Sequence, residues 1–126
     1  MRVLNIIEAA YRGTLEEQDD PVLWITHALK GAGAEIDVLL RGNAVNYGVR
    51  EQDASGLSFG AAEQTQPAHL ASDLSSLAAK GARIYAVAES LQALGLSREN
   101  LVEQLTLLPE GELPALFAEY RQVWHW

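Results

Sequence analysis

Six polar residues of this 126-residue chain have side chains suited to holding a ligand, and all six follow apolar segments with the pattern of strands. They are Arg41, Asn43, Asn46, Tyr47, Glu89 and Ser90. The first four follow residues 35–40, and the other two follow residues 84–88. Because ligands collect at the carboxyl ends of strands in an open parallel sheet, we expect one crevice there. An arginine, two amides and a phenol predict a site for a small anion or another small polar ligand.

Two other interpretations of these residues stay open. In a purely structural one, Asn43 caps a short helix and Arg41 pairs with a local carboxylate. In an enzymatic one, the chain is a hydrolase that uses Ser90 with Glu89 or a histidine. Ser90 does not lie in a G-x-S-x-G motif that would support the second interpretation, so we predict no catalytic residue.

Metal and redox chemistry find little support. Cysteine is absent, which excludes disulfides, thiolate zinc sites, iron–sulfur clusters and cysteine nucleophiles. The histidines, His27, His69 and His125, lack the spacing of a helical metal site, and His27 and His69 are expected at the surface of their helices. Four acidic residues between positions 16 and 20 precede a helix, whose positive end favours carboxylates. We therefore expect neither a metal nor a cofactor.

The elements that position these residues alternate between strand and helix. Apolar runs predict five strands, at residues 3–7, 35–40, 84–88, 104–108 and 122–126. Helical spacing predicts helices between them, at residues 44–50, 67–81, 91–94, 97–102 and 114–120. A further helix begins with Asp20 as N-cap and Pro21 in its first turn, and it ends at Gly31 and Gly33. The alternation predicts an α/β fold with a mostly parallel sheet of about five strands, in one domain spanning 1–126.

Two segments deserve separate predictions. Trp24 is expected on the apolar face of the helix that begins at Pro21. The connection of residues 41–66 is mostly polar, and a loop of this length is usually functional or mobile. Its glycines predict flexibility in the second half.

The charge balance limits the partners of the chain. Seventeen acidic residues against nine basic ones give a net charge of −8, which argues against nucleic acid and against an anionic membrane surface. The N-terminal apolar run, residues 3–7, is shorter than a signal peptide requires, so we expect a cytoplasmic protein.

The segment 122–126 carries Trp124 and Trp126 on one side of the expected last strand. Two tryptophans on one strand face are typical of either a core or an interface between subunits. Both interpretations stay open.

With these segments, the chain resembles the DsrE/DsrF/TusD-like family over nearly its whole length. The resemblance depends on the first strand, the helix through Trp24, and the segments Arg41-Gly-Asn-Ala-Val and Gly81-Ala-Arg-Ile-Tyr-Ala-Val-Ala-Glu-Ser-Leu. It implies a three-layer α/β/α domain and a homo- or hetero-oligomer, commonly a trimer or hexamer. Many members of the family carry persulfide sulfur on a cysteine just past the third strand.

The resemblance fails at that cysteine, because Val87 or its neighbour Ala88 stands in its place. Valine forms neither a thiolate nor a persulfide. We therefore expect an oligomeric subunit that binds a small polar ligand or another protein, and no sulfur transfer by this chain. The alternative is an accessory subunit of a sulfur-relay complex in which a DsrE-like hetero-partner supplies the cysteine.

Overall fold

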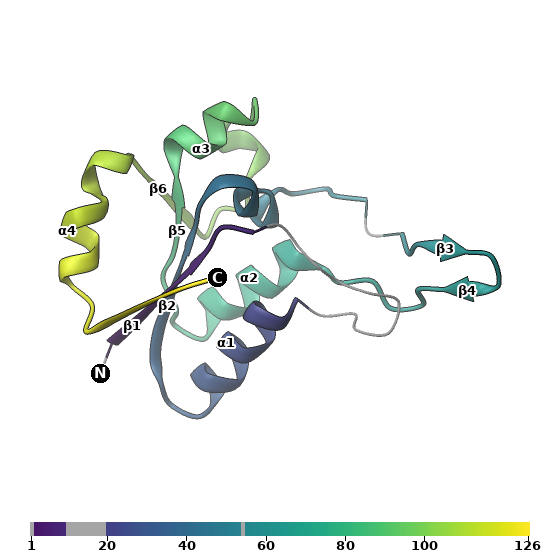
Figure 1. Ribbon diagram of the computed structural model, residues 1–126, viewed down its shortest axis with the longest axis horizontal. Helices are drawn as coiled ribbons and strands as arrows, with labels where there is room; N and C mark the ends of the chain where they lie inside the picture. Colours follow the sequence, from purple (N-terminus) through teal and green to yellow (C-terminus); the bar gives the residue numbers. More distant parts are fainter. Residues whose placement is uncertain (1, 10–19, 54) are drawn as a thin grey trace.

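A computed structural model describes residues 2–9, 20–53 and 55–126 (Figure 1). Its main feature is a five-stranded sheet in the order β6-β5-β2-β1-β7, and every adjacent pair of strands is parallel. The strands are β1 (Arg2–Ile7), β2 (Glu35–Leu40), β5 (Ile84–Val87), β6 (Leu105–Leu108) and β7 (Gln122–His125). The predicted α/β class and the predicted five parallel strands are confirmed.

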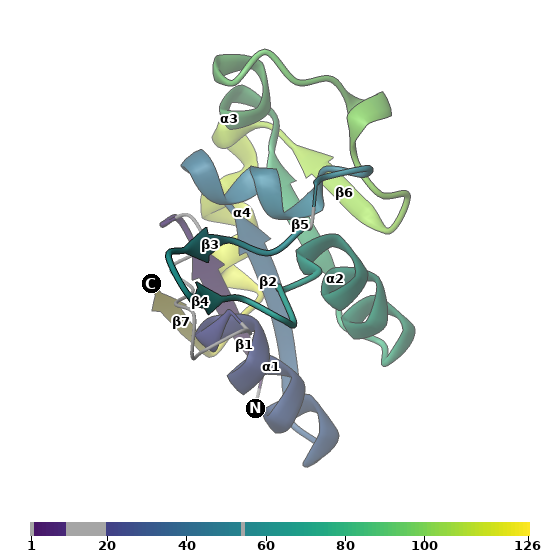
Figure 2. The same cartoon turned by 90° about the vertical axis from the view of Figure 1, so that its right-hand side faces the viewer.

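Helices cover both faces of this sheet, which gives three layers. On one face lie α1 (Pro21–Gly31) and α2 (Leu70–Ala79), whose Leu23, Leu74 and Leu77 join the larger core (Figures 1 and 2). On the other face lies the short helix α4 (Leu113–Ala118). Side chains alternate along β2, so Val38 and Leu40 belong to the larger core and Leu39 to the smaller one. Because of this alternation, the position of a residue along a strand determines toward which of the two cores its side chain points.

Helix α1 begins as predicted. The Asp20 carboxylate accepts hydrogen bonds from the backbone N–H groups of Val22 and Leu23, at 2.9 and 3.0 Å, and Pro21 occupies the first turn. The prediction for Trp24 is wrong, because 59% of this residue is exposed. The buried positions of the helix are Leu23 and Thr26, so the face turned to the sheet lies beside Trp24 and does not include it.

Several predicted boundaries shift. Helix α2 begins three residues after Pro67, and α4 covers less than the predicted 114–120. Helix α3 (Ala88–Ala93) begins directly after Val87, so Ala88 is helical and does not extend the strand. The two remaining predicted helices are short 3₁₀ helices, η1 (Gly42–Gly48) and η2 (Arg98–Asn100). A third 3₁₀ helix, η3 (Glu110–Glu112), was not predicted. Ser97 and Asn100 form a capping box at η2, which satisfies backbone N–H groups at the start of that helix.

The connection after η1 contains an element that the sequence did not predict. Strands β3 (Ser58–Phe59) and β4 (Ala62–Glu63) form a small antiparallel hairpin, which extends away from the main sheet (Figure 1). Gly60 makes its turn with a φ of 60°. Leu57 and Phe59 are 57% and 65% exposed, so this hairpin adds no core to the domain.

Three buried polar side chains form hydrogen bonds that link neighbouring elements of the domain. Asn5, fully buried in β1, donates from Nδ2 to the Thr26 hydroxyl at 2.8 Å, and Thr26 in turn donates to the carbonyl of Val22 at 2.6 Å. Asp37 in β2 accepts from the backbone N–H of Arg83 at 2.8 Å. These contacts satisfy groups whose burial would otherwise be costly.

Candidate functional site

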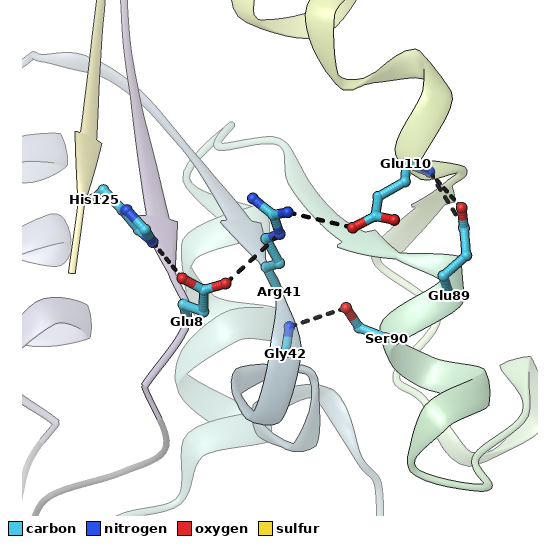
Figure 3. A network of polar contacts seen from close by, with 7 residues as sticks. All are labelled: Glu8, Arg41, Gly42, Glu89, Ser90, Glu110 and His125. Atoms are coloured by element: carbon cyan, nitrogen blue, oxygen red, sulfur yellow. Dashed lines mark hydrogen bonds and ion pairs between the residues drawn. The ribbon is translucent and has the colours of Figure 1, made fainter.

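The carboxyl ends of all five parallel strands contribute to one polar network, with Arg41 at its centre (Figure 3). Arg41 directly follows β2. Its Nε lies 3.7 Å from Glu8 Oε1, just past β1, and its NH2 lies 3.3 Å from Glu110 Oε1, just past β6. We call the seven residues of Figure 3 the Arg41 network: Glu8, Arg41, Gly42, Glu89, Ser90, Glu110 and His125.

The outer contacts of the Arg41 network bring in the other two strands. Glu8 Oε2 lies 2.6 Å from Nε2 of His125, at the end of β7. The backbone N–H of Glu110 donates to both carboxylate oxygens of Glu89, at 3.2 and 3.0 Å, on the first turn after β5. The hydroxyl of Ser90 accepts a 3.0 Å hydrogen bond from the backbone N–H of Gly42. Of the predicted site residues, Arg41, Glu89 and Ser90 therefore meet.

The charge of the Arg41 network limits what it can bind. Two carboxylates, those of Glu8 and Glu110, pair with the one guanidinium, and the side chains of Arg41, Glu8 and Glu110 are 35%, 43% and 49% exposed. A third carboxylate, that of Glu89, accepts from the backbone of Glu110. An anion would have to displace a carboxylate from Arg41 and would meet the other acids. The arrangement thus favours a ligand with hydroxyl or ammonium donors over the small anion that the sequence also suggested.

Asn43 and Asn46 lie beside the network on the outer surface of η1. Both are exposed, and the Asn46 amide donates to the backbone carbonyl of Asn43 at 3.0 Å. The interpretation of Asn43 as a helix cap is wrong, because η1 begins at Gly42 with Arg41 as its N-cap residue, and no side-chain hydrogen bond caps it. The companion interpretation of Arg41 as an ion-pair partner is confirmed.

Tyr47 faces a different environment from the Arg41 network. It is 2% exposed and belongs to the larger core, and its hydroxyl donates to Asp20 Oδ2 at 2.5 Å. The prediction of one crevice containing both Tyr47 and Arg41 is therefore wrong. The reason is the path of the chain through η1. Arg41 precedes this helix and contacts Glu110 of η3, whereas Tyr47 lies near its end and contacts Asp20 at the start of α1.

A separate cavity of about 240 Å³ lies where Tyr47 meets α1 and the end of the chain. Ile7, Ala9, Pro21 and Val22 provide its apolar lining, Asp20 and Tyr47 its polar groups, and Trp126 a further wall. We call it the Trp126 cavity. The indole N–H of Trp126 donates to the buried Asn5 Oδ1 at 3.3 Å, which orients the ring although 52% of the residue is exposed.

Sequence reasoning missed Glu8, Glu110 and His125. The signal was present for the first two, because each follows an apolar run within two residues of its end, the same rule that identified Arg41. The position of His125 opposite Glu8 depends on the pairing of β7 with β1, which no local pattern reveals. Of the acidic residues between 16 and 20, only Asp20 lies within the described residues.

Chemistry at this edge is restricted by what the described residues contain. Among them, no group of three or more histidine, aspartate or glutamate side chains is arranged to hold a metal ion. No histidine or carboxylate in the described part of the chain contacts the Ser90 hydroxyl, so the base that a nucleophilic serine needs is missing there. Val87 is fully buried in the smaller core. Within the same ranges, no helix is long and apolar enough to cross a membrane.

Several solved structures resemble this chain, and two of them illustrate the likeness. One is the ychN protein from E. coli, with a TM-score of 0.73 and 17% identity over the full length of both chains. The other is MTH1491 from Methanobacterium thermoautotrophicum, a protein of unknown function, with a TM-score of 0.58 and 20% identity over 95% of this chain and 94% of that one. No family model and no curated protein matches the sequence. The chain therefore has the YchN-like, DsrE-like fold that its motifs implied.

Proposed function

We propose that this chain is a non-catalytic binding subunit that holds a small polar ligand against the Arg41 network. The observation that carries this proposal is the position of Arg41, between Glu8 and Glu110 at the carboxyl edge of a parallel sheet. This edge is the usual ligand position in such folds. The network side chains are partly exposed, so a ligand can reach them without any rearrangement of the core.

The proposed ligand carries hydroxyl or ammonium groups. Glu8, Glu89 and Glu110 present acceptor oxygens, whereas Arg41 is the one cation of the Arg41 network when His125 is neutral. A neutral polyol or an amine would donate to these oxygens and leave the Arg41 ion pairs in place.

We further propose that the subunit forms a homo-oligomer, with β7 as part of the interface. Strand β7 is an outer strand of the sheet, and its sequence places Val123, 40% exposed, and the half-buried Trp124 along that edge. An edge without lysine, proline or a bulge is open to pairing with another chain.

Native mass spectrometry on protein purified gently from its source cells tests both parts together. A homo-oligomer with extra mass of metabolite size is the expected result. The extra mass should be lost in the double variant Arg41→Ala/Asn43→Ala and kept in the control Arg121→Ala, an exposed arginine at the other end of the sheet. If the double variant retained the extra mass unchanged, the assignment of the ligand to the Arg41 network would be wrong.

A separate variant tests the proposed β7 interface. Val123→Lys places a charge on the β7 edge and should shift the mass to the monomer, with little effect on folding because Val123 lies outside both cores. A monomeric wild-type protein would contradict the proposed assembly. A mixed oligomer with a cysteine-bearing relative would favour the accessory-subunit alternative instead.

A further inference from the structure

We propose that the Trp126 cavity is a second binding site, for a small organic cation with an aromatic or apolar body. This inference goes beyond the proposed function, because none of the residues that line the cavity belongs to the Arg41 network. Its volume of about 240 Å³ is below the ~300–1,000 Å³ typical of drug-sized ligands, so the ligand is of fragment size.

The charge of the ligand follows from Asp20. This residue is 3% exposed, and none of the ion pairs among the described residues includes it. A buried carboxylate is normally compensated by a cation or by hydrogen bonds. Oδ1 accepts hydrogen bonds from two backbone N–H groups, whereas the Tyr47 hydroxyl is the one donor to Oδ2 among the described residues. A carboxylate oxygen has about two acceptor positions, so Oδ2 retains one for an ammonium group.

The two cations that lie near Asp20 in the described part of the chain are engaged elsewhere. Lys80 and His27 border a neighbouring cavity that Asp20 also lines, but Lys80 Nζ lies 3.1 Å from His27 Nδ1, and His27 Nε2 lies 3.0 Å from the carbonyl of Asp73. An anionic ligand has no corresponding advantage, because the Asp20 carboxylate already occupies the positive end of α1.

The body of the ligand follows from Trp126. Its indole N–H is held by Asn5, and Asn5 is held by Thr26, so a chain of hydrogen bonds anchors the ring to α1. The exposed indole face can attract a cation and stack on an aromatic ring. The apolar side chains of Ile7 and Val22 complete a surface that a purely polar ligand would leave poorly covered.

Three probes of similar size and different charge test this site. They are 2-phenylethylammonium, 2-phenylethanol and phenylacetate, titrated while the indole N–H signals of the three tryptophans are followed by ¹H–¹⁵N NMR. The Trp126 signal is assigned by its loss in Trp126→Phe. We expect the cation to shift this signal with a Kd in about the millimolar range and to bind about tenfold more tightly than the other two probes.

Two variants separate charge from shape. Asp20→Asn retains a helix-capping side chain but loses the charge, and it should weaken binding of the cation about tenfold and leave the alcohol unchanged. Asp53→Asn, which removes the same charge from an exposed residue outside this cavity, is the matched control and should have no effect. Val22→Phe fills the cavity and should weaken all three probes.

Equal affinity for the three probes, or equal losses in Asp20→Asn and Asp53→Asn, would overturn the proposal. So would a Trp126 signal that does not respond. If Asp20→Asn fails to fold, the probe series on the wild-type protein and on Val22→Phe still decides. The double variant Arg41→Ala/Asn43→Ala should bind 2-phenylethylammonium normally, so failure of this site and failure of the Arg41 network are distinguishable.

Discussion

The Tyr120 hydroxyl donates a 2.5 Å hydrogen bond to Asp37 Oδ2, although 83 residues separate the two in the chain. The bond ties the segment after α4 to the central strand β2. The Arg2 guanidinium lies over the Tyr120 ring, 4.8 Å from its centroid, and its NH2 lies 3.3 Å from Asp37 Oδ2. This cluster anchors the smaller core at the amino end of the sheet, away from both proposed sites.

We predict that this cluster makes the protein sensitive to alkali. Burial, and then the hydrogen bond to Asp37, raise the pKa of Tyr120 above its ordinary value of 10.0. The folded state therefore keeps a proton that the unfolded state loses, so the contribution to stability is complete below about pH 10 and falls as the pH rises above it.

Urea unfolding at pH 8 and pH 11 checks this prediction. Tyr120→Phe should lower the free energy of unfolding by about 1 kcal/mol at pH 8, because one hydrogen bond is lost. It should also reduce the further loss between pH 8 and pH 11. An identical alkaline loss in wild type and variant would contradict the role of Tyr120.

Thr26→Val should destabilise the fold by about 1–3 kcal/mol. The variant removes the acceptor of the buried Asn5 amide and leaves that donor unpaired between α1 and β1. Thr26→Ser keeps the hydroxyl and serves as the control. A smaller loss in the valine variant than in the serine variant, measured by denaturant unfolding, would show that the Asn5 contact contributes little.

Val87→Cys restores a thiol at the position where the family resemblance expects one. Because Val87 is fully buried, the thiol should react with a disulfide reagent at least about a hundredfold more slowly in the native protein than in guanidinium. The chain has no other cysteine, so the measurement has no background. Fast labelling of the native protein would mean that the end of β5 opens readily. A thiol at this position could then take part in sulfur chemistry without unfolding of the domain.

Arg41→Ala should change the free energy of unfolding by less than about 1 kcal/mol. Its ion pairs with Glu8 and Glu110 are partly exposed, and such pairs contribute little to stability. Thermal unfolding with Arg121→Ala alongside provides the comparison. A large loss of stability would assign Arg41 a structural role and weaken the proposed ligand site.

The sequence predicts the local elements well where one strong signal acts within a few residues. The apolar run of β1 and the Asp20-Pro21 start of α1 need no distant partner to be recognised. The hairpin β3–β4 escaped prediction because two-residue strands carry almost no periodicity. Trp24 was misplaced because helical spacing gives the width of an apolar face only approximately, and the sheet then decides which part is covered.

The candidate site likewise has features that the local sequence predicts and features that depend on contacts between distant residues. That Arg41, Glu89 and Ser90 lie at one edge follows from the parallel sheet, which the alternation of strands and helices already implies. That Glu110 and Glu8 flank Arg41, whereas Tyr47 turns to Asp20, depends on the strand order and on the path of η1. A sequence specifies which side chains follow a strand, because that is a matter of neighbouring residues. Which of them meet depends on contacts between residues far apart in the chain, and only the packed tertiary structure decides those.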